Sequence, residues 1–286
     1  APVIVVGNIT VGGTGKTPVV IALARFLKEK GWRPGIVSRG YGGKIKHFPY
    51  QVHQNSNARE VGDEPLLIVR HTDCPTVIDP NRSRGVRALL KRAHCNLVIS
   101  DDGLQHSSLG RNIEIIVVDG ERRFGNNFCL PAGPLREPTS RLNSVDFVIS
   151  KENPLRHEFK LSLIPDHFYQ LIQPKIKKTL DYFHGKTLHA VAGIGNPDQF
   201  FNSLRKLNLK IIEHPFPDHY LFKPHDFSYG SDAIIIMTEK DAVKCVGFVD
   251  ARLWCLNTKT ELDTNLLNTV LKRVTTLNNN LKSSSG

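Results

Sequence analysis

The sequence has few cysteines, and they are not paired. Its 286 residues include five, an odd number, scattered widely and without a C-x-x-C pair. A disulfide framework or a zinc site needs closely spaced or paired cysteines, so the sequence disfavours both and favours reduced thiols in a cytosolic setting. The five are Cys74, Cys95, Cys129, Cys245 and Cys255.

The sequence also lacks a long apolar run. A transmembrane helix needs about 20 consecutive apolar residues, and a secretory signal needs a basic start followed by an apolar stretch. Neither is visible, yet hydrophobic residues make up 40% of the chain. This composition is typical of a globular protein, and the length suits one large α/β domain or two smaller ones.

The charge is basic, with a formal net charge of +11. The basic residues are dispersed, and no basic motif with interleaved aromatic residues stands out, so we expect no nucleic-acid partner. An anionic lipid surface would attract such a protein, but an ordinary solvated surface could have the same composition. The charge permits membrane contact without requiring it.

What the sequence does contain is a glycine-rich loop between an apolar run and a helical pattern. Residues 3–6 are uncharged and β-branched, as in a strand buried on both faces, and residues 17–30 have helical apolar spacing closed by Gly31. A phosphate held by the loop would lie at the N-terminus of that helix. We therefore predict a nucleotide-binding loop. It comprises Thr10, Val11, Gly12, Gly13, Thr14, Gly15, Lys16 and Thr17.

The last two residues of this loop have distinct chemistry. Lys16 can reach the β- and γ-phosphates of ATP, and the Thr17 hydroxyl can ligate Mg²⁺. The usual pattern has its first glycine where this chain has Thr10. A tight turn without a ligand is the alternative, but it does not explain the flanking strand and helix.

Strands and helices alternate through the first half of the chain. This alternation predicts an α/β fold, a P-loop NTPase-like, mainly parallel sheet with helices on both faces. Ligands of such sheets bind at the carboxyl ends of the strands. The expected strands are 3–6, 35–38, 76–79, 97–101, 113–119 and 145–150, and the expected helices include 17–30 and 84–93.

Four successive expected strands run into polar sequence, which favours one assembled site at their carboxyl ends. The run 97–101 has the form of a Walker-B strand that brings Asp101 to a metal, and Asp102 would orient it or hold the ion through water. A simple turn at Asp102 is the alternative. Gln105 and His106 follow, either as substrate contacts or as a helix start.

Two further segments carry candidate functional groups. Asp63, in Gly-Asp-Glu-Pro, either caps a helix or accepts the proton of a hydroxyl acceptor. The proline-rich segment 130–138 predicts a stiff loop that holds Arg136, suited to a phosphate, and Glu137, suited to a metal. An isolated ion pair of these two residues is the alternative.

The second half predicts a smaller α/β unit. Its expected strands are 187–192, 209–214 and 233–237, with a helix at 198–207. We expect a P-loop kinase domain at 1–144, a smaller domain at 154–251, linkers at 145–153 and 252–260, a helix at 261–277 that packs back on the first domain, and a disordered tail at 278–286. A helix lying on a membrane is the alternative for 261–277.

Seven segments, in chain order, resemble those of the tetraacyldisaccharide 4′-kinase family. They are GNITVGGTGKTP, SRGYGG, GDEP, DPNRSRG, ISDDGLQH, LPAGPLREP and FPDHYLF, and they span nearly the whole chain. The resemblance implies phosphorylation, with ATP and Mg²⁺, of the 4′-hydroxyl of a tetraacylated glucosamine disaccharide 1-phosphate, which forms lipid IVA in lipid A biosynthesis. It implies peripheral association with the cytoplasmic face of the bacterial inner membrane. We expect a monomer whose partners are this lipid-linked acceptor and the anionic membrane surface.

The resemblance also assigns residues. Asp63 matches the carboxylate that takes the substrate proton, His219 the histidine that raises its basicity, and Lys16 the phosphate lysine. The metal positions are matched by Thr17, Asp101, Asp102, Glu64 and Glu137, and the polar positions around phosphates, metal and sugar by Arg39, Arg82, Gln105, His106 and Arg136. Family members carry a further N-terminal segment that contributes to membrane docking, and we expect this chain, which does not begin with Met, to start just after it.

A P-loop ATPase acting as a protein-binding switch remains the alternative function. Many dimerising ATPases of the wider class carry a loop lysine where this chain has Val11, which disfavours that alternative. His219 lies far along the chain from the phosphate loop. Its catalytic use therefore requires the second unit to fold over the first.

Overall fold

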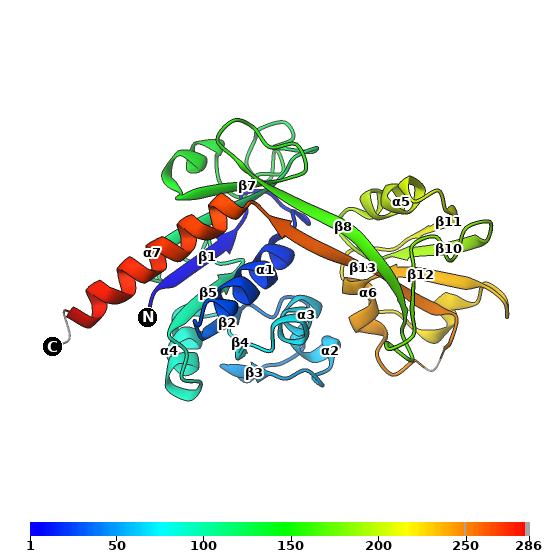
Figure 1. Cartoon of the computed structure of the whole chain (residues 1–286), viewed down its shortest axis with the longest axis horizontal. Coiled ribbons are helices and arrows are strands. Elements are labelled where there is room, and N and C mark those ends of the chain that lie inside the picture. Colours follow the sequence, from blue (N-terminus) through cyan, green and yellow to red (C-terminus); the bar gives the residue numbers. More distant parts are fainter. Residues whose placement is uncertain (249, 284–286) are drawn as a thin grey trace.

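The computed structural model describes residues 1–248 and 250–283 (Figure 1). Its strands are β1 (Val3–Gly7), β2 (Pro34–Ser38), β3 (Tyr50–Val52), β4 (Thr76–Ile78), β5 (Leu97–Asp101), β6 (Ile113–Asp119), β7 (Phe147–Lys151), β8 (Phe159–Gln170), β9 (Lys177–Lys178), β10 (Thr187–Ala192), β11 (Lys210–Pro215), β12 (Ile234–Thr238) and β13 (Leu253–Leu262). Its α-helices are α1 (Lys16–Glu29), α2 (Ala58–Val61), α3 (Asp63–Thr72), α4 (Arg82–Arg92), α5 (Pro197–Lys206), α6 (Glu239–Ala242) and α7 (Thr264–Ser283).

One continuous sheet runs through the described part of the chain. Its order is β11-β10-β12-β13-β8-β7-β6-β1-β5-β2-β4-β3, with β9 paired to β8. The pairs from β7 through β4 are all parallel, as are those from β11 through β13. The mainly parallel α/β fold predicted from the alternating pattern is confirmed.

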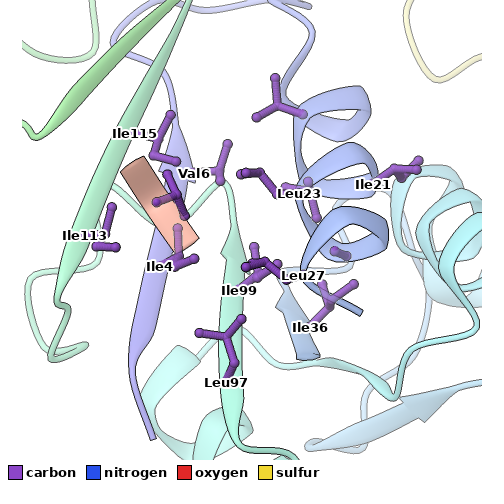
Figure 2. Close-up of a cluster of buried hydrophobic side chains, with 14 of the residues drawn as sticks. Ile4, Val6, Ile21, Leu23, Leu27, Ile36, Leu97, Ile99, Ile113 and Ile115 are labelled. Atoms are coloured by element: carbon purple, nitrogen blue, oxygen red, sulfur yellow. The ribbon is translucent and has the colours of Figure 1, made fainter. Parts of the chain in front are cut away.

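The first half of the sheet is buried on both faces because its central strands are apolar on both sides. All residues of β1 and β5 are buried. One face packs on α1, where Ile4 and Ile99 meet Leu23 and Leu27 (Figure 2). The other face packs on α4 through residues such as Val86. This double cover fixes the carboxyl ends of the strands relative to α1.

Helix α7 belongs to the same core as α1. Its apolar stripe of Leu266, Val270 and Val274 is buried in the cluster that also holds the α1 side chains, although α7 comes at the end of the chain (Figure 1). The helix continues to Ser283. The prediction of disorder is therefore wrong for residues 278–283, where the helix continues beyond Leu277, which packs on the core; residues 284–286 lie outside the described ranges.

The second half repeats the layered arrangement on a smaller scale. Helix α5 packs on one face of β10 through Phe201 and Leu204, and Phe222 and Phe227 cover the other face. Because β10, β11 and β12 are parallel, their carboxyl ends also meet at one edge. That edge faces the phosphate loop, as the contacts below show.

Two long strands join the halves. β8 and β13 pair in antiparallel fashion from Leu161 and Leu262 to Gln170 and Trp254, and they cross from one half to the other (Figure 1). The ranges expected as linkers, 145–153 and 252–260, thus contain β7 and most of β13. No helix in the described ranges combines the length and apolar character needed to cross a bilayer.

Candidate active site

The phosphate loop lies between β1 and α1, where the sequence predicts it. Gly15 is the N-cap residue of α1 and adopts a left-handed conformation (φ 95°), which glycine tolerates best. Because glycine has no capping side chain, the first N–H groups of α1 stay available to a phosphate. Asn8 steadies the loop by donating a hydrogen bond to Thr14 (3.2 Å).

Two neighbouring loops brace the phosphate loop. The amide of Val11 donates to the carbonyl of Pro134 (2.8 Å), and the amide of Arg136 donates to the carbonyl of Ile9 (2.7 Å). The guanidinium of Arg122 donates to the carbonyl of Gly13 (2.7 Å). The proline-rich segment is therefore fastened to the loop, and Arg136 comes into the site with it.

Two cations converge on Asp102 at the end of β5. Lys16 Nζ lies 3.5 Å from its carboxylate and Arg136 Nη1 lies 3.1 Å away. Burial favours a higher pKa for Asp102, but the two cations outweigh it and lower the pKa. Its backbone is left-handed (φ 48°), an uncommon conformation for aspartate. The strained turn thus holds an ionised carboxylate where Lys16 and Arg136 can also meet a phosphate.

Asp101 has a different environment. Its Oδ2 accepts a hydrogen bond from Ser38 (3.0 Å), whereas Oδ1 is buried and has no partner among the described residues. Burial, followed by the charges of Glu64 and Asp102, raises its pKa to about 7. A buried carboxylate oxygen without a partner, close to two more acids, is suited to a cation.

This donor set fits Mg²⁺ held together with a nucleotide. Carboxylate and hydroxyl oxygens are its preferred ligands, and Mg²⁺ in such sites also keeps waters and phosphate oxygens. Within 1–248 and 250–283, no group of three or more His, Cys, Asp or Glu side chains could hold a metal alone. Asp101 and the buried Thr17 therefore suit a shared metal site better than a closed cage.

Arg82 is held by backbone carbonyls at the turn after β5. Its side chain is fully buried and donates to the carbonyl of Asp79 (2.7 Å) and to those of Asp101 and Asp102 (3.4 Å each). Burial lowers its pKa to about 10, so the group still carries its charge. Arg82 therefore supports the turn after β5, and its Nε has no hydrogen-bond partner among the described residues.

The remaining polar positions vary in how firmly they are held. Glu137 accepts hydrogen bonds from Gln105 (2.6 Å) and Arg141 (3.2 Å), so both of its oxygens are engaged by side chains. His106 is half-buried after β5, and burial is the main cause of its lowered pKa. Arg39 is exposed at the end of β2. Arg39 is thus accessible to a ligand, whereas Glu137 would first have to leave its partners.

The structure brings Asp63 and His219 together although 156 residues separate them. His219 Nδ1 lies 3.0 Å from Asp63 Oδ2, and the Glu64 amide donates to Asp63 Oδ1 (2.8 Å). Asp63 is only 4% exposed at the start of α3. The His219 ring packs against Tyr41, with 5.0 Å between ring centroids.

The charges of this pair reinforce each other. Burial favours a higher pKa for Asp63, but the hydrogen bond to His219 and the charge of Lys240 outweigh it and lower the pKa. The hydrogen bond to Asp63 in turn raises the pKa of His219. The arrangement therefore holds an ionised carboxylate with an imidazole that readily becomes cationic.

The second half of the molecule touches the phosphate loop directly. A Cβ on Gly195 would lie 3.0 Å from the backbone nitrogen of Gly13, so the two loops approach closely and a larger residue would crowd the phosphate loop. Arg59 of α2 also donates to the carbonyl of Phe222 (3.1 Å). The requirement that the second unit fold over the first is met in this structure.

The sequence pattern did not identify three residues that contact the site: Ser38, Arg122 and Lys240. Ser38 and Lys240 lie at or just after the carboxyl ends of β2 and β12, so the strand-end rule could have found both. Lys240 Nζ lies 3.1 Å from Glu64. Arg122 follows β6 within a charged loop, where no local signal separates it from its neighbours.

Comparison with known proteins gives the same family that the sequence motifs resemble. The family model for tetraacyldisaccharide-1-P 4′-kinase matches residues 1–276. A protein of Nitrosococcus oceani named tetraacyldisaccharide 4′-kinase is 52% identical over 254 residues, covering 88% of this chain and 75% of the relative. One of the same name from Methylobacillus flagellatus is 49% identical over 278 residues, covering 96% and 83%.

A solved structure is similar as well. It is the "apo" form of LpxK from Aquifex aeolicus in complex with ATP, with a TM-score of 0.78 and 28% identity. The match covers 96% of this chain and 89% of that one.

Proposed function

The chain belongs to the tetraacyldisaccharide-1-P 4′-kinase family, and we propose that it transfers the γ-phosphate of ATP to the 4′-hydroxyl of a tetraacylated glucosamine disaccharide 1-phosphate. The product is lipid IVA, a precursor in lipid A biosynthesis. The observation that carries the proposal is the Asp63–His219 pair, whose neighbour Glu64 acts, together with Lys16 of the phosphate loop, on the charge of Asp101. Such a pair can accept the proton of an acceptor hydroxyl, and the family relationship identifies that acceptor as the lipid disaccharide.

The phosphate loop binds and orients the donor. The N–H groups at the start of α1 and the ammonium of Lys16 contact the β- and γ-phosphates, and Lys16 exchanges its contact with Asp102 for these. Arg136, which also contacts Asp102, offsets charge on the transferred group. Thr17, Asp101 and Asp102 would hold Mg²⁺ together with Glu64, and the bound ion would neutralise charge on the phosphates.

Asp63 accepts the proton of the acceptor hydroxyl at a carboxylate oxygen. His219 orients that carboxylate and, when protonated, balances its charge. In phosphoryl transfer the main contribution of such a pair is to position the hydroxyl for attack, because bond formation to the phosphorus lags behind bond breaking. Closure of the second half over the phosphate loop excludes water from this geometry.

We also propose that the protein is peripheral to the cytoplasmic face of the inner membrane. The acceptor carries four acyl chains and is therefore a membrane lipid. The net charge of +11 favours an anionic leaflet. We expect a monomer, because the phosphate loop has Val11 where many dimerising ATPases have a lysine.

The test is transfer of label from γ-³²P-ATP to a chloroform-soluble disaccharide. The proposal predicts labelled lipid that depends on the acceptor and is lost when Asp63 is changed to Asn. Release of labelled inorganic phosphate alone, stimulated by a protein and never by the lipid, would instead support an ATP-dependent switch.

A further inference from the structure

Lys240 lies among three carboxylates contributed by both halves of the molecule. Its Nζ is 3.1 Å from Glu64, 3.5 Å from Asp218 and 4.0 Å from Asp63. Glu64 and Asp63 begin α3 in the first half, whereas Lys240 and Asp218 belong to the second. The ammonium of Lys240 therefore links the two halves of the molecule next to Asp63, the proposed base.

The electrostatic consequence follows from the burial of the cluster. The Asp63 side chain is 3% exposed and that of Lys240 is 21% exposed, so solvent screens their charges poorly. Without the ammonium, Asp218 would face Glu64 and Asp63 across the boundary with like charge. The imidazole of His219 lies 3.7 Å from Asp218 and 3.0 Å from Asp63, and it can offset these acids when protonated. The more distant charge of Lys244 also favours the ionised form of Asp63.

The backbone on either side of Lys240 is linked by hydrogen bonds to the loop that approaches the phosphate loop. Thr238 caps α6 by accepting the amide hydrogen of Asp241 (3.1 Å). The carboxylate of Asp241 accepts the amide hydrogen of Gly193 (3.1 Å) and pairs with the buried Lys244 (2.7 Å). Gly193 leads directly to Gly195, which contacts Gly13. A shift at the start of α6 is therefore expected to shift this loop.

We propose that Lys240 is a positioning residue of the kinase, whose ammonium holds Asp218 against Asp63 and Glu64 so that His219 reaches Asp63 and the loop 193–196 closes on the phosphate loop. The expected effect on kcat rests on the proposed function. The expected effect on the loop 193–196 rests on the structure alone. A single exposed ion pair contributes little to stability. Lys240 has three carboxylate partners and low exposure, so its contribution is expected to be larger.

The kinetic test compares Lys240→Met with Lys240→Arg. Lys240→Met removes the charge at similar length, and we expect kcat to fall about ten- to a hundredfold, as for loss of a charged hydrogen bond, with KM for ATP little changed. Lys240→Arg should stay within about fivefold of wild type because the charge remains. The control is Lys206→Met, an exposed lysine on α5, which should leave kcat unchanged.

A second-site change separates repulsion from lost packing. In the Lys240→Met background, Asp218→Asn removes one of the like charges but keeps an oxygen for the His219 amide, which donates to Asp218 (3.0 Å). Partial recovery of kcat in the double variant is expected. Equal losses for Lys240→Met and Lys240→Arg, or no recovery with Asp218→Asn, would overturn the proposal.

Hydrogen–deuterium exchange tests the conformational part without an acceptor. In Lys240→Met, amides of peptides covering 193–196 and 218–220 should exchange faster than in wild type, whereas Lys240→Arg should match wild type. Unchanged exchange in Lys240→Met would contradict the positioning role even if catalysis fell. If wild type labels no lipid, the proposed function fails, and the exchange result still decides this inference.

Discussion

Asp63 and Asp101 are both buried carboxylates in the same acidic cluster, yet their environments push them in opposite directions. Burial alone favours the protonated form of each. Asp63 faces His219 and Lys240, and its pKa is lowered. Asp101 faces Glu64 and Asp102, and its pKa is raised to about 7. Burial raises the pKa of both carboxylates, and the neighbouring charges reverse that effect at Asp63 but add to it at Asp101. Asp63 is therefore suited to accept a proton, and Asp101 is suited to bind a cation.

On the Asp101 side of this comparison, the largest effect is expected from Asp101→Asn. With a cation ligand lost, Mg²⁺-dependent ATP binding should weaken about a hundredfold, which removes about 2.7 kcal/mol of ligand stabilisation at fixed ligand concentration. Thermal unfolding with and without Mg²⁺-ATP measures it. The ligand-free protein should be as stable as wild type or more so, because a costly buried charge is gone. Marked destabilisation without ligand would show that the raised pKa of Asp101 is misassigned.

The next effect tests the partner of Asp63. In His219→Gln the carboxylate loses a group that can become cationic, and we expect kcat for the lipid acceptor to fall about tenfold or more, with ATP binding unchanged. Initial rates at saturating ATP provide the measurement. Phe168→Leu is the control for a general loss of stability, because Phe168 is buried in the same apolar cluster as Phe201 and Leu204. This variant should have a lower melting temperature than wild type but the same kcat at a temperature where it is folded.

A smaller effect is expected from Ser38→Ala. It deletes the hydrogen bond to Asp101 and leaves that oxygen buried without a partner, at a cost of about 1–2 kcal/mol in the free energy of unfolding. Urea unfolding without ligand reports this value. In an Asp101→Asn background the cost should shrink. An equal cost in both backgrounds would mean that Ser38 acts through packing and not through Asp101.

The smallest effect is a pH dependence of stability. The folded-state pKa of His219 is raised above its ordinary value of 6.5, chiefly by its hydrogen bond to Asp63. Its contribution is therefore fully present below that ordinary value and is lost as the pH rises through the folded pKa. The stability difference between wild type and His219→Gln should be larger at about pH 6 than at about pH 9. A difference that grows with pH would contradict this sign.

Most strands that the sequence predicted are apolar and buried, although the partly exposed β11 was also predicted, at 209–214. β1, β5 and β6 are apolar, β-branched and buried on both faces, so their pattern is legible without knowledge of their neighbours. β8 and β13 were not predicted because they are partly exposed, and β8 contains Pro165. Their pattern depends on mutual pairing across the chain, which no local window contains.

The site, like the strands, was predictable from the residues where the signal lies within a short segment. The phosphate loop and Asp101 follow from local strand, loop and helix chemistry. The contact of Asp63 with His219 depends on how the second half closes, and only the family resemblance pointed to it. The burial of Arg82 was not predicted either, because it depends on tertiary packing against the turn after β5, and its contact with a phosphate stays a prediction.

The most direct measurement is single-turnover transfer from prebound γ-³²P-ATP to the lipid acceptor by wild type and by Asp63→Asn. Asn keeps the size of the side chain but cannot accept the proton, so the rate of labelled lipid formation should fall by about two to three orders of magnitude while ATP remains bound. Transfer at the wild-type rate by Asp63→Asn would contradict the assignment of Asp63 as the acceptor base.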